Sequence, residues 1–84
     1  MADHYYIIVK EGCSWCGKAI DLIEKSGGTY SELVYENLGS ITWPVLFMRT
    51  HGFKTVPQIF DSQYNLIGGY DSLNSYLNGY ANYN

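Results

Sequence analysis

The sequence predicts an α/β sandwich in which three helices flank one mixed four-stranded sheet. Apolar and aromatic runs typical of strands alternate with helical patterns, in the order β-α-β-α-β-β-α. The chain has 84 residues, of which 46% are hydrophobic and 15% are charged, which suits one globular domain and not two. We therefore expect residues 1–84 to form a single domain, with a polar, frayed tail over residues 78–84.

The first half of the chain has the pattern of a strand, a helix and a second strand. Residues 5–9 are aromatic and β-branched, which is typical of a buried strand. A helix is expected to begin at Cys13 or Ser14, with Ser14 as its N-cap, and to end at the glycine pair that follows Ser26. Residues 29–35 form the second expected strand. This unit requires a right-handed crossover, which makes its two strands parallel.

The second half of the chain predicts a helix, a hairpin and a last helix. A helix is expected over residues 42–50, where apolar residues recur at helical spacing. Residues 56–60 and 66–67 are expected strands separated by a turn, an arrangement that allows an antiparallel pair. The last helix is expected over residues 71–77, because an aspartate and a serine at its start are good caps.

Charge and hydropathy exclude two classes of partner. The net charge is −3 and the five basic residues are scattered, so we expect no nucleic-acid binding. No stretch approaches the roughly 20 apolar residues of a membrane span, and no secretory signal is recognised at the start. We therefore expect a cytoplasmic protein. In that compartment a Cys-x-x-Cys pair is more often catalytic, redox-active or metal-binding than a static structural disulfide.

The cysteines of Cys13-Ser14-Trp15-Cys16 are the first candidates for chemistry. Cys13 falls at the expected start of a helix, where free N–H groups favour a thiolate and lower the thiol pKa below its free value of about 8.5. Cys16 lies one turn further, close enough to form a disulfide with Cys13, and is expected to be more buried and less reactive. Cys13 is thus the expected nucleophile and Cys16 the resolving thiol.

Other interpretations of the cysteine pair stay open on the residues alone. A static disulfide is one. A metal site is another, but it would need His4 and His51, whose spacing from the cysteines matches no familiar zinc motif, so no metal is expected. A small copper-carrying domain also has a Cys-x-x-Cys after its first strand, but its expected element order differs from that of this chain.

Three further features accompany the cysteines. Lys10 lies three residues before Cys13 and is either a solvated lysine or a cation beside the thiolate. The bond before Pro57 is a candidate cis peptide that would turn the Val56 backbone toward Cys13, where an extended substrate could pair with it. The segment from Gly68 to Asp71 is a turn and cap whose helix N–H groups could bind a carboxylate.

Together these motifs resemble those of the glutaredoxin family. The resemblance runs from about residue 5 to residue 77 and rests on three segments in the family's order: Lys10-x-x-Cys13-x-x-Cys16, Thr55-Val56-Pro57-Gln58-Ile59-Phe60 and Ile67-Gly68-Gly69-Tyr70-Asp71-Ser72-Leu73. It implies a thioredoxin-like fold with strand order 2-1-3-4. It also implies a monomeric glutathione-dependent oxidoreductase that reduces protein disulfides and glutathione mixed disulfides, without a tightly bound cofactor.

The resemblance implies roles for individual residues. Cys13 and Cys16 take the catalytic positions, and ribonucleotide reductase becomes a candidate client. Lys10 takes the position that meets the glycine carboxylate of glutathione, and Tyr70 with Asp71 that of its γ-glutamyl end. The full set implied to bind glutathione is Lys10, Trp15, Thr55, Val56, Pro57, Tyr70 and Asp71.

The sequence also departs from the family pattern. The usual proline and tyrosine between the cysteines are replaced by Ser14 and Trp15, and an aspartate often found after Asp71 is replaced by Ser72. Relatives without that proline sometimes bind an iron–sulfur cluster. A cluster bridging two subunits, with Cys13 as ligand, is therefore the alternative function.

Overall fold

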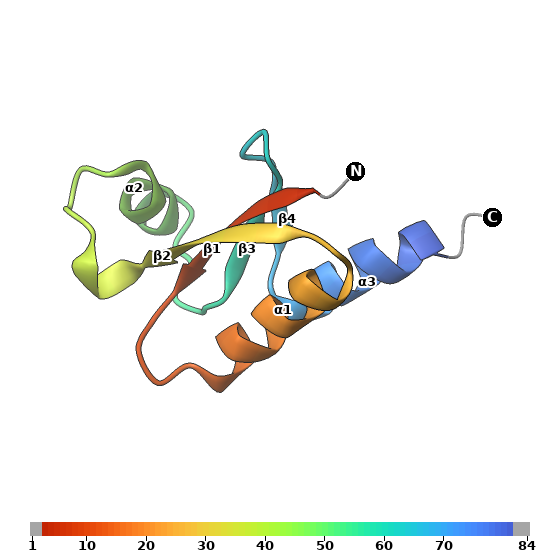
Figure 1. The fold of residues 1–84 in the computed structure, drawn as a ribbon. Helices are drawn as coiled ribbons and strands as arrows, with labels where there is room; N and C mark the ends of the chain where they lie inside the picture. The colour runs from red at the N-terminus through yellow and green to blue at the C-terminus, as the bar shows by residue number, and fades with distance from the viewer. Residues whose placement is uncertain (1–2, 82–84) are drawn as a thin grey trace.

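The computed structural model describes residues 3–81, with side chains through residue 78, and within this range it has one four-stranded sheet and three α-helices (Figure 1). This confirms the predicted fold class. Among the same residues, no helix is long and apolar enough to cross a membrane. In chain order the elements are β1 (His4–Val9), α1 (Ser14–Lys25), β2 (Thr29–Val34), a 3₁₀ turn η1 (Tyr35–Asn37), α2 (Trp43–Thr50), β3 (Gln58–Phe60), β4 (Leu66–Gly68) and α3 (Tyr70–Ala81).

The sheet has the strand order β2-β1-β3-β4. Strand β1 pairs with β2 in parallel, from His4 opposite Thr29 to Val9 opposite Val34. It pairs with β3 antiparallel, and β3 pairs antiparallel with β4. The strand–helix–strand unit therefore forms the parallel half and the hairpin the antiparallel half, as the residue patterns predict.

Alternation along β1 divides the core between the two faces of the sheet. Tyr5, Ile7 and Val9 point to the face covered by α1 and α3, where Leu73 and Ile23 complete a buried cluster. Tyr6 and Ile8 pack on the α2 face, which has a smaller buried cluster. Figure 1 shows α1 and α3 together below the sheet and α2 on the opposite side. The larger core thus lies beneath the helix that carries the cysteines.

Three details differ from the sequence-based expectation. The N-cap of α1 is Cys13 and not Ser14, because the Cys13 sulfur accepts the N–H that the cap must satisfy. Helix α3 begins at Tyr70, before the expected caps, and continues past Leu77 to Ala81. The first four residues of the predicted frayed tail are therefore helical, and residues 82–84 lie outside the described residues.

Candidate active site

The two cysteines form a disulfide at the start of α1, with their Cα atoms 5.3 Å apart. The Cys16 N–H donates a hydrogen bond to the Cys13 sulfur over 3.2 Å. Cys13 is half-buried, whereas Cys16 is only 4% exposed, as expected from its place one turn into the helix. The sulfur of Cys13 is thus the accessible one, and an amide donor and a helix N-terminus already face it.

The loop between β1 and α1 brings Cys13 to this position. Gly12 has a φ of +74°, a left-handed conformation that glycine adopts without steric cost. The chain can therefore reverse within a short loop, so that Cys13 caps the helix directly behind the end of β1. Another residue at position 12 would strain this turn.

The loop before β3 is distant from Cys13 in the sequence but lies beside it in the fold. The Cys13 sulfur lies 3.7 Å from the carbonyl oxygen of Val56, and the Val56–Pro57 peptide bond is cis, as predicted. The buried side chain of Gln58 supports this loop, because its amide nitrogen donates to the carbonyl oxygen of Thr55 over 3.1 Å. Gln58 was not a predicted site residue. The usable signal in the sequence is a polar amide directly after Pro57 within an expected buried strand, where it needs a hydrogen-bond partner.

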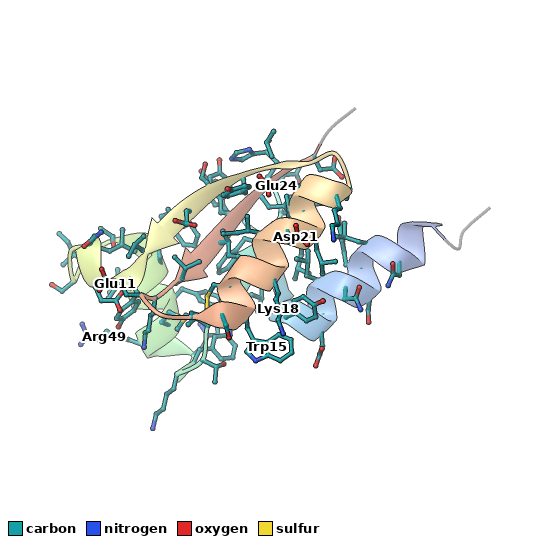
Figure 2. All side chains as sticks on the ribbon, turned by 60° about the horizontal axis from the view of Figure 1, so that its bottom comes forward. Glu11, Trp15, Lys18, Asp21, Glu24 and Arg49 are labelled. Atoms are coloured by element: carbon teal, nitrogen blue, oxygen red, sulfur yellow. A yellow bond between two sulfur atoms is a disulfide. The ribbon has the colours of Figure 1, made fainter. Side chains whose placement is uncertain are left out.

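A cleft of about 370 Å³ opens beside this loop, and we call it the Trp15 cleft. Trp15 and Tyr70 form an aromatic wall, with ring centroids 5.1 Å apart. The Lys18 ammonium lies 4.1 Å from the centre of the Trp15 ring, a cation–π contact with an indole that remains half-exposed (Figure 2). The cleft is lined by Trp15, Thr55, Val56, Pro57, Gly69, Tyr70, Asp71 and Ser72.

A tight contact fixes the start of α3 against the Trp15 cleft. Gly68 has a φ of +126°, and a Cβ placed there would lie 2.7 Å from the Ser72 hydroxyl oxygen. Only glycine fits at this last position of β4, against the first turn of α3. The helix therefore begins at Tyr70 immediately beside the cleft, and Asp71 lies in its first turn. Ser72, a departure from the family pattern, thus serves in packing the turn.

Lys10 is the one predicted glutathione residue outside the Trp15 cleft. Its ammonium lies 5.0 Å from the centre of the Tyr35 ring, in the 3₁₀ turn after β2. It borders a second cleft of about 450 Å³, which we call the Gly17 cleft. This cleft is lined by Val9, Lys10, Glu11, Gly12, Cys13, Ser14, Cys16, Gly17, Ile20, Glu32 and Val34. Neither the second cleft nor the Lys10–Tyr35 contact was predicted.

The comparisons with solved structures find glutaredoxins. Reduced Escherichia coli glutaredoxin is 30% identical, with a TM-score of 0.68, and the match covers 90% of this chain and 94% of that one. A Brucella melitensis glutaredoxin is 27% identical, with a TM-score of 0.67 and coverage of 94% and 82%. A buckwheat glutaredoxin–glutathione complex is 22% identical, with a TM-score of 0.69 and coverage of 92% and 71%. No family model matches the sequence, and the search of curated proteins found no match.

These likenesses differ in what they establish. At 22% identity, the buckwheat structure shows that the thioredoxin-like fold is shared. The sequence identity to the Escherichia coli protein is 30% over nearly the full length of both chains, and it therefore indicates a shared family as well as a shared fold. The Cys13–Cys16 disulfide lies at the start of the first helix of that fold. On this evidence the chain belongs to the glutaredoxin family of thiol–disulfide oxidoreductases.

Proposed function

We propose that this glutaredoxin uses glutathione to reduce protein disulfides and glutathione mixed disulfides, with Cys13 as nucleophile and Cys16 as resolving thiol. The observation that carries the proposal is the setting of the Cys13 sulfur. It accepts the Cys16 N–H, lies 3.7 Å from the Val56 carbonyl oxygen, and stands beside a cleft lined by six of the seven residues expected to bind glutathione.

The dithiol reaction proceeds through one mixed disulfide. The Cys13 thiolate attacks a substrate sulfur, so that a Cys13–substrate disulfide forms and the other substrate sulfur leaves as a thiolate. The Cys16 thiolate then attacks the Cys13 sulfur, which releases the second substrate thiol and forms the Cys13–Cys16 disulfide. Two glutathione thiols reduce that disulfide and become oxidised glutathione. For glutathione mixed disulfides, a second glutathione replaces Cys16 in the resolving step.

Glutathione has a carboxylate at each end, and the surroundings of Cys13 suit both. In the proposed complex the γ-glutamyl carboxylate meets the N–H groups of Tyr70 and Asp71 at the start of α3. The glycine carboxylate points to Lys10, on the other side of Cys13. The tripeptide backbone pairs with Val56. That the buckwheat relative was solved as a glutathione complex supports this choice of ligand.

The wider setting is also part of the proposal. We infer that residues 1–84 act as one monomeric cytoplasmic domain without a tightly bound cofactor, and that ribonucleotide reductase is one candidate among its protein clients. The scattered basic residues argue against a nucleic-acid partner, and the sequence has no apolar segment of the length of a membrane span.

A coupled assay tests the choice of reductant. The mixed disulfide of glutathione and 2-mercaptoethanol is offered with glutathione and glutathione reductase in one arm, and with a thioredoxin reductase in the other. We expect turnover in the glutathione arm. Turnover supported only by the thioredoxin reductase would contradict the proposal, and so would a visible absorbance band of a cluster in freshly purified protein.

A further inference from the structure

Both cysteines of the disulfide line the Gly17 cleft, but glutathione binding as proposed uses only Lys10 and the Cys13 sulfur of this lining. Its lining combines an apolar part, which includes Val9, Ile20 and Val34, with the sulfur-bearing residues Cys13 and Cys16. Its volume of about 450 Å³ exceeds that of the Trp15 cleft. An apolar recess that opens beside the nucleophile is suited to a side chain of the molecule bonded to it.

Gly17 has no structural reason to be a glycine. It lies inside α1, where glycine is less favourable than alanine. Its φ is not in the left-handed region, and a Cβ added there would meet no atom within 4 Å. Gly17 is itself one of the residues that line the cleft, and it contributes no side chain there. A side chain at this position would project into space that is now free.

The charged residues that line the Gly17 cleft, which we call its rim, are two glutamates and one lysine. The exposed residues Glu11 and Glu32 line it. Glu36 lies outside the lining, but its carboxylate is close to it because it accepts the Glu11 N–H over 3.3 Å. Lys10 is the basic residue of this lining, and its ammonium stacks over Tyr35. In Figure 2, Glu11 and Trp15 lie on opposite sides of the start of α1. The rim therefore favours a ligand that carries positive charge.

We propose that the Gly17 cleft is a subsite for protein substrates, which holds an apolar side chain adjacent to the substrate cysteine in a segment that also carries a basic residue. The inference rests on the proposed function, because the substrate must be bonded to Cys13, and it deepens that function by naming the substrate class. Glutathione has no apolar side chain to place in this cleft, so the subsite distinguishes protein substrates from the small thiol.

The test uses reduced protein in excess over peptide disulfides, without glutathione. Cys13 bonds to one peptide sulfur and releases the other peptide as a thiol, and Cys16 then releases the second peptide and closes the enzyme disulfide. The substrates are the homodimeric disulfides of acetyl-Leu-Cys-Leu-Lys-amide and acetyl-Ser-Cys-Ser-Lys-amide. The readout is the ratio of their rate constants within each variant, which cancels any general change in reactivity.

We expect the leucine peptide to react about tenfold faster than the serine peptide with the natural protein. The ratio falls close to one in Gly17→Leu, whose side chain fills the cleft, and is retained in Gly17→Ala, whose methyl group does not. A ratio near one in the natural protein, or one that Gly17→Leu leaves unchanged, overturns the subsite alone. No reaction with either peptide overturns the proposed function as well.

A charge test does not depend on the folding of the Gly17 variants. Replacing lysine by glutamate in the leucine peptide should slow its reaction about threefold. Glu32→Gln should reduce that difference, whereas Glu24→Gln, on the exposed face of α1, should leave it unchanged (Figure 2). Equal rates for the lysine and glutamate peptides, or equal effects of the two variants, contradict the acidic rim as a determinant.

Discussion

The Trp15 cleft and the Gly17 cleft lie near the same cysteine pair but are built differently. Both cysteines line the Gly17 cleft, whereas the Trp15 cleft approaches Cys13 through Val56. The Trp15 cleft is assembled from three segments distant in the sequence: the start of α1, the loop before β3 and the first turn of α3. The Gly17 cleft comes mainly from one continuous stretch, from the end of β1 into α1, and is completed by β2. The first therefore depends on the tertiary fold, and the second largely on the local path of the chain around Cys13.

The chemistry of the two clefts differs as well. The Trp15 cleft presents aromatic rings and the N-terminus of α3, which suit a small anionic tripeptide. The Gly17 cleft presents an apolar lining and carboxylates, which suit a longer and more basic segment. Under the proposed function, one nucleophile near two unlike clefts would serve two kinds of substrate. The following substitutions test this division.

Replacing the cysteines should have the largest effect. Cys13→Ser removes the sulfur that both clefts serve, and we expect it to abolish reduction of glutathione mixed disulfides and of protein disulfides. Cys16→Ser should retain most of the glutathione mixed-disulfide activity, because a second glutathione can resolve the intermediate. Steady-state turnover of both substrates measures this. Equal losses in the two variants would contradict the assignment of roles.

Loss of the aromatic wall should impair the glutathione reaction strongly. Tyr70→Ala removes the ring that packs against Trp15, and we expect kcat/KM for a glutathione mixed disulfide to fall about tenfold. The matched control is Tyr64→Ala, because that exposed ring contacts Tyr6 and Trp43 on the α2 face. If both variants retain full activity, the Trp15 cleft is not the glutathione site.

Reversal of the Lys10 charge should have a moderate effect. Lys10→Glu replaces attraction to the glycine carboxylate by repulsion, and we expect the KM for glutathione to rise about threefold at low salt and less at high salt. Lys25→Glu is the control, because that lysine pairs with Asp21 at the far end of α1. A KM for glutathione that Lys10→Glu leaves unchanged at low ionic strength would show that Lys10 only stacks on Tyr35.

The smallest effect on catalysis should come from Asp61, which lines neither cleft. Burial alone would raise the pKa of the Asp61 carboxyl, but hydrogen bonds from the backbone and side chain of Asn65 and the backbone of Gln63 lower it. We expect Asp61→Ala to reduce the free energy of unfolding by about 1 kcal/mol at neutral pH, without changing turnover.

The pH dependence of the Asp61 effect has a definite sign. A carboxyl whose pKa is lower in the folded state stabilises the protein above its unfolded pKa of about 4. That contribution disappears as the pH falls through the folded value. The difference in unfolding free energy between the natural protein and Asp61→Ala should therefore shrink in acid. Urea titrations at neutral and acidic pH measure it, and a difference that grows in acid would contradict the hydrogen-bond account.

The sequence predicted the features that depend on local pattern. The strands of the parallel unit and the burial of Cys16 follow from residue type and spacing. The cis bond before Pro57 was expected from the motif that resembles the family's, since residue type alone favours a trans bond. The sequence did not predict that Cys13 caps its own helix, because cysteine is not a usual cap and only the course of the loop brings its sulfur to the Cys16 N–H.

The remaining gaps are contacts between distant segments. The packing of Trp15 on Tyr70 joins residues from two different helices, and the stacking of Lys10 on Tyr35 joins a strand end to a 3₁₀ turn. The two residues of each pair are too far apart in the sequence for a helix or strand periodicity to predict their contact. The sequence did not predict the Gly17 cleft for a related reason. The segments that line it meet only in the fold, and at position 17 it is bordered by a residue without a side chain.

Direct identification of the glutathione adduct tests the central claim. The Cys16→Ser variant, reduced and then treated with oxidised glutathione, cannot resolve the first mixed disulfide by itself. Peptide mapping by mass spectrometry should find glutathione bonded to Cys13, and Tyr70→Ala introduced into the same variant should slow the formation of this adduct. Failure of Cys13 to take up glutathione, under conditions where iodoacetamide still alkylates it, would contradict the account.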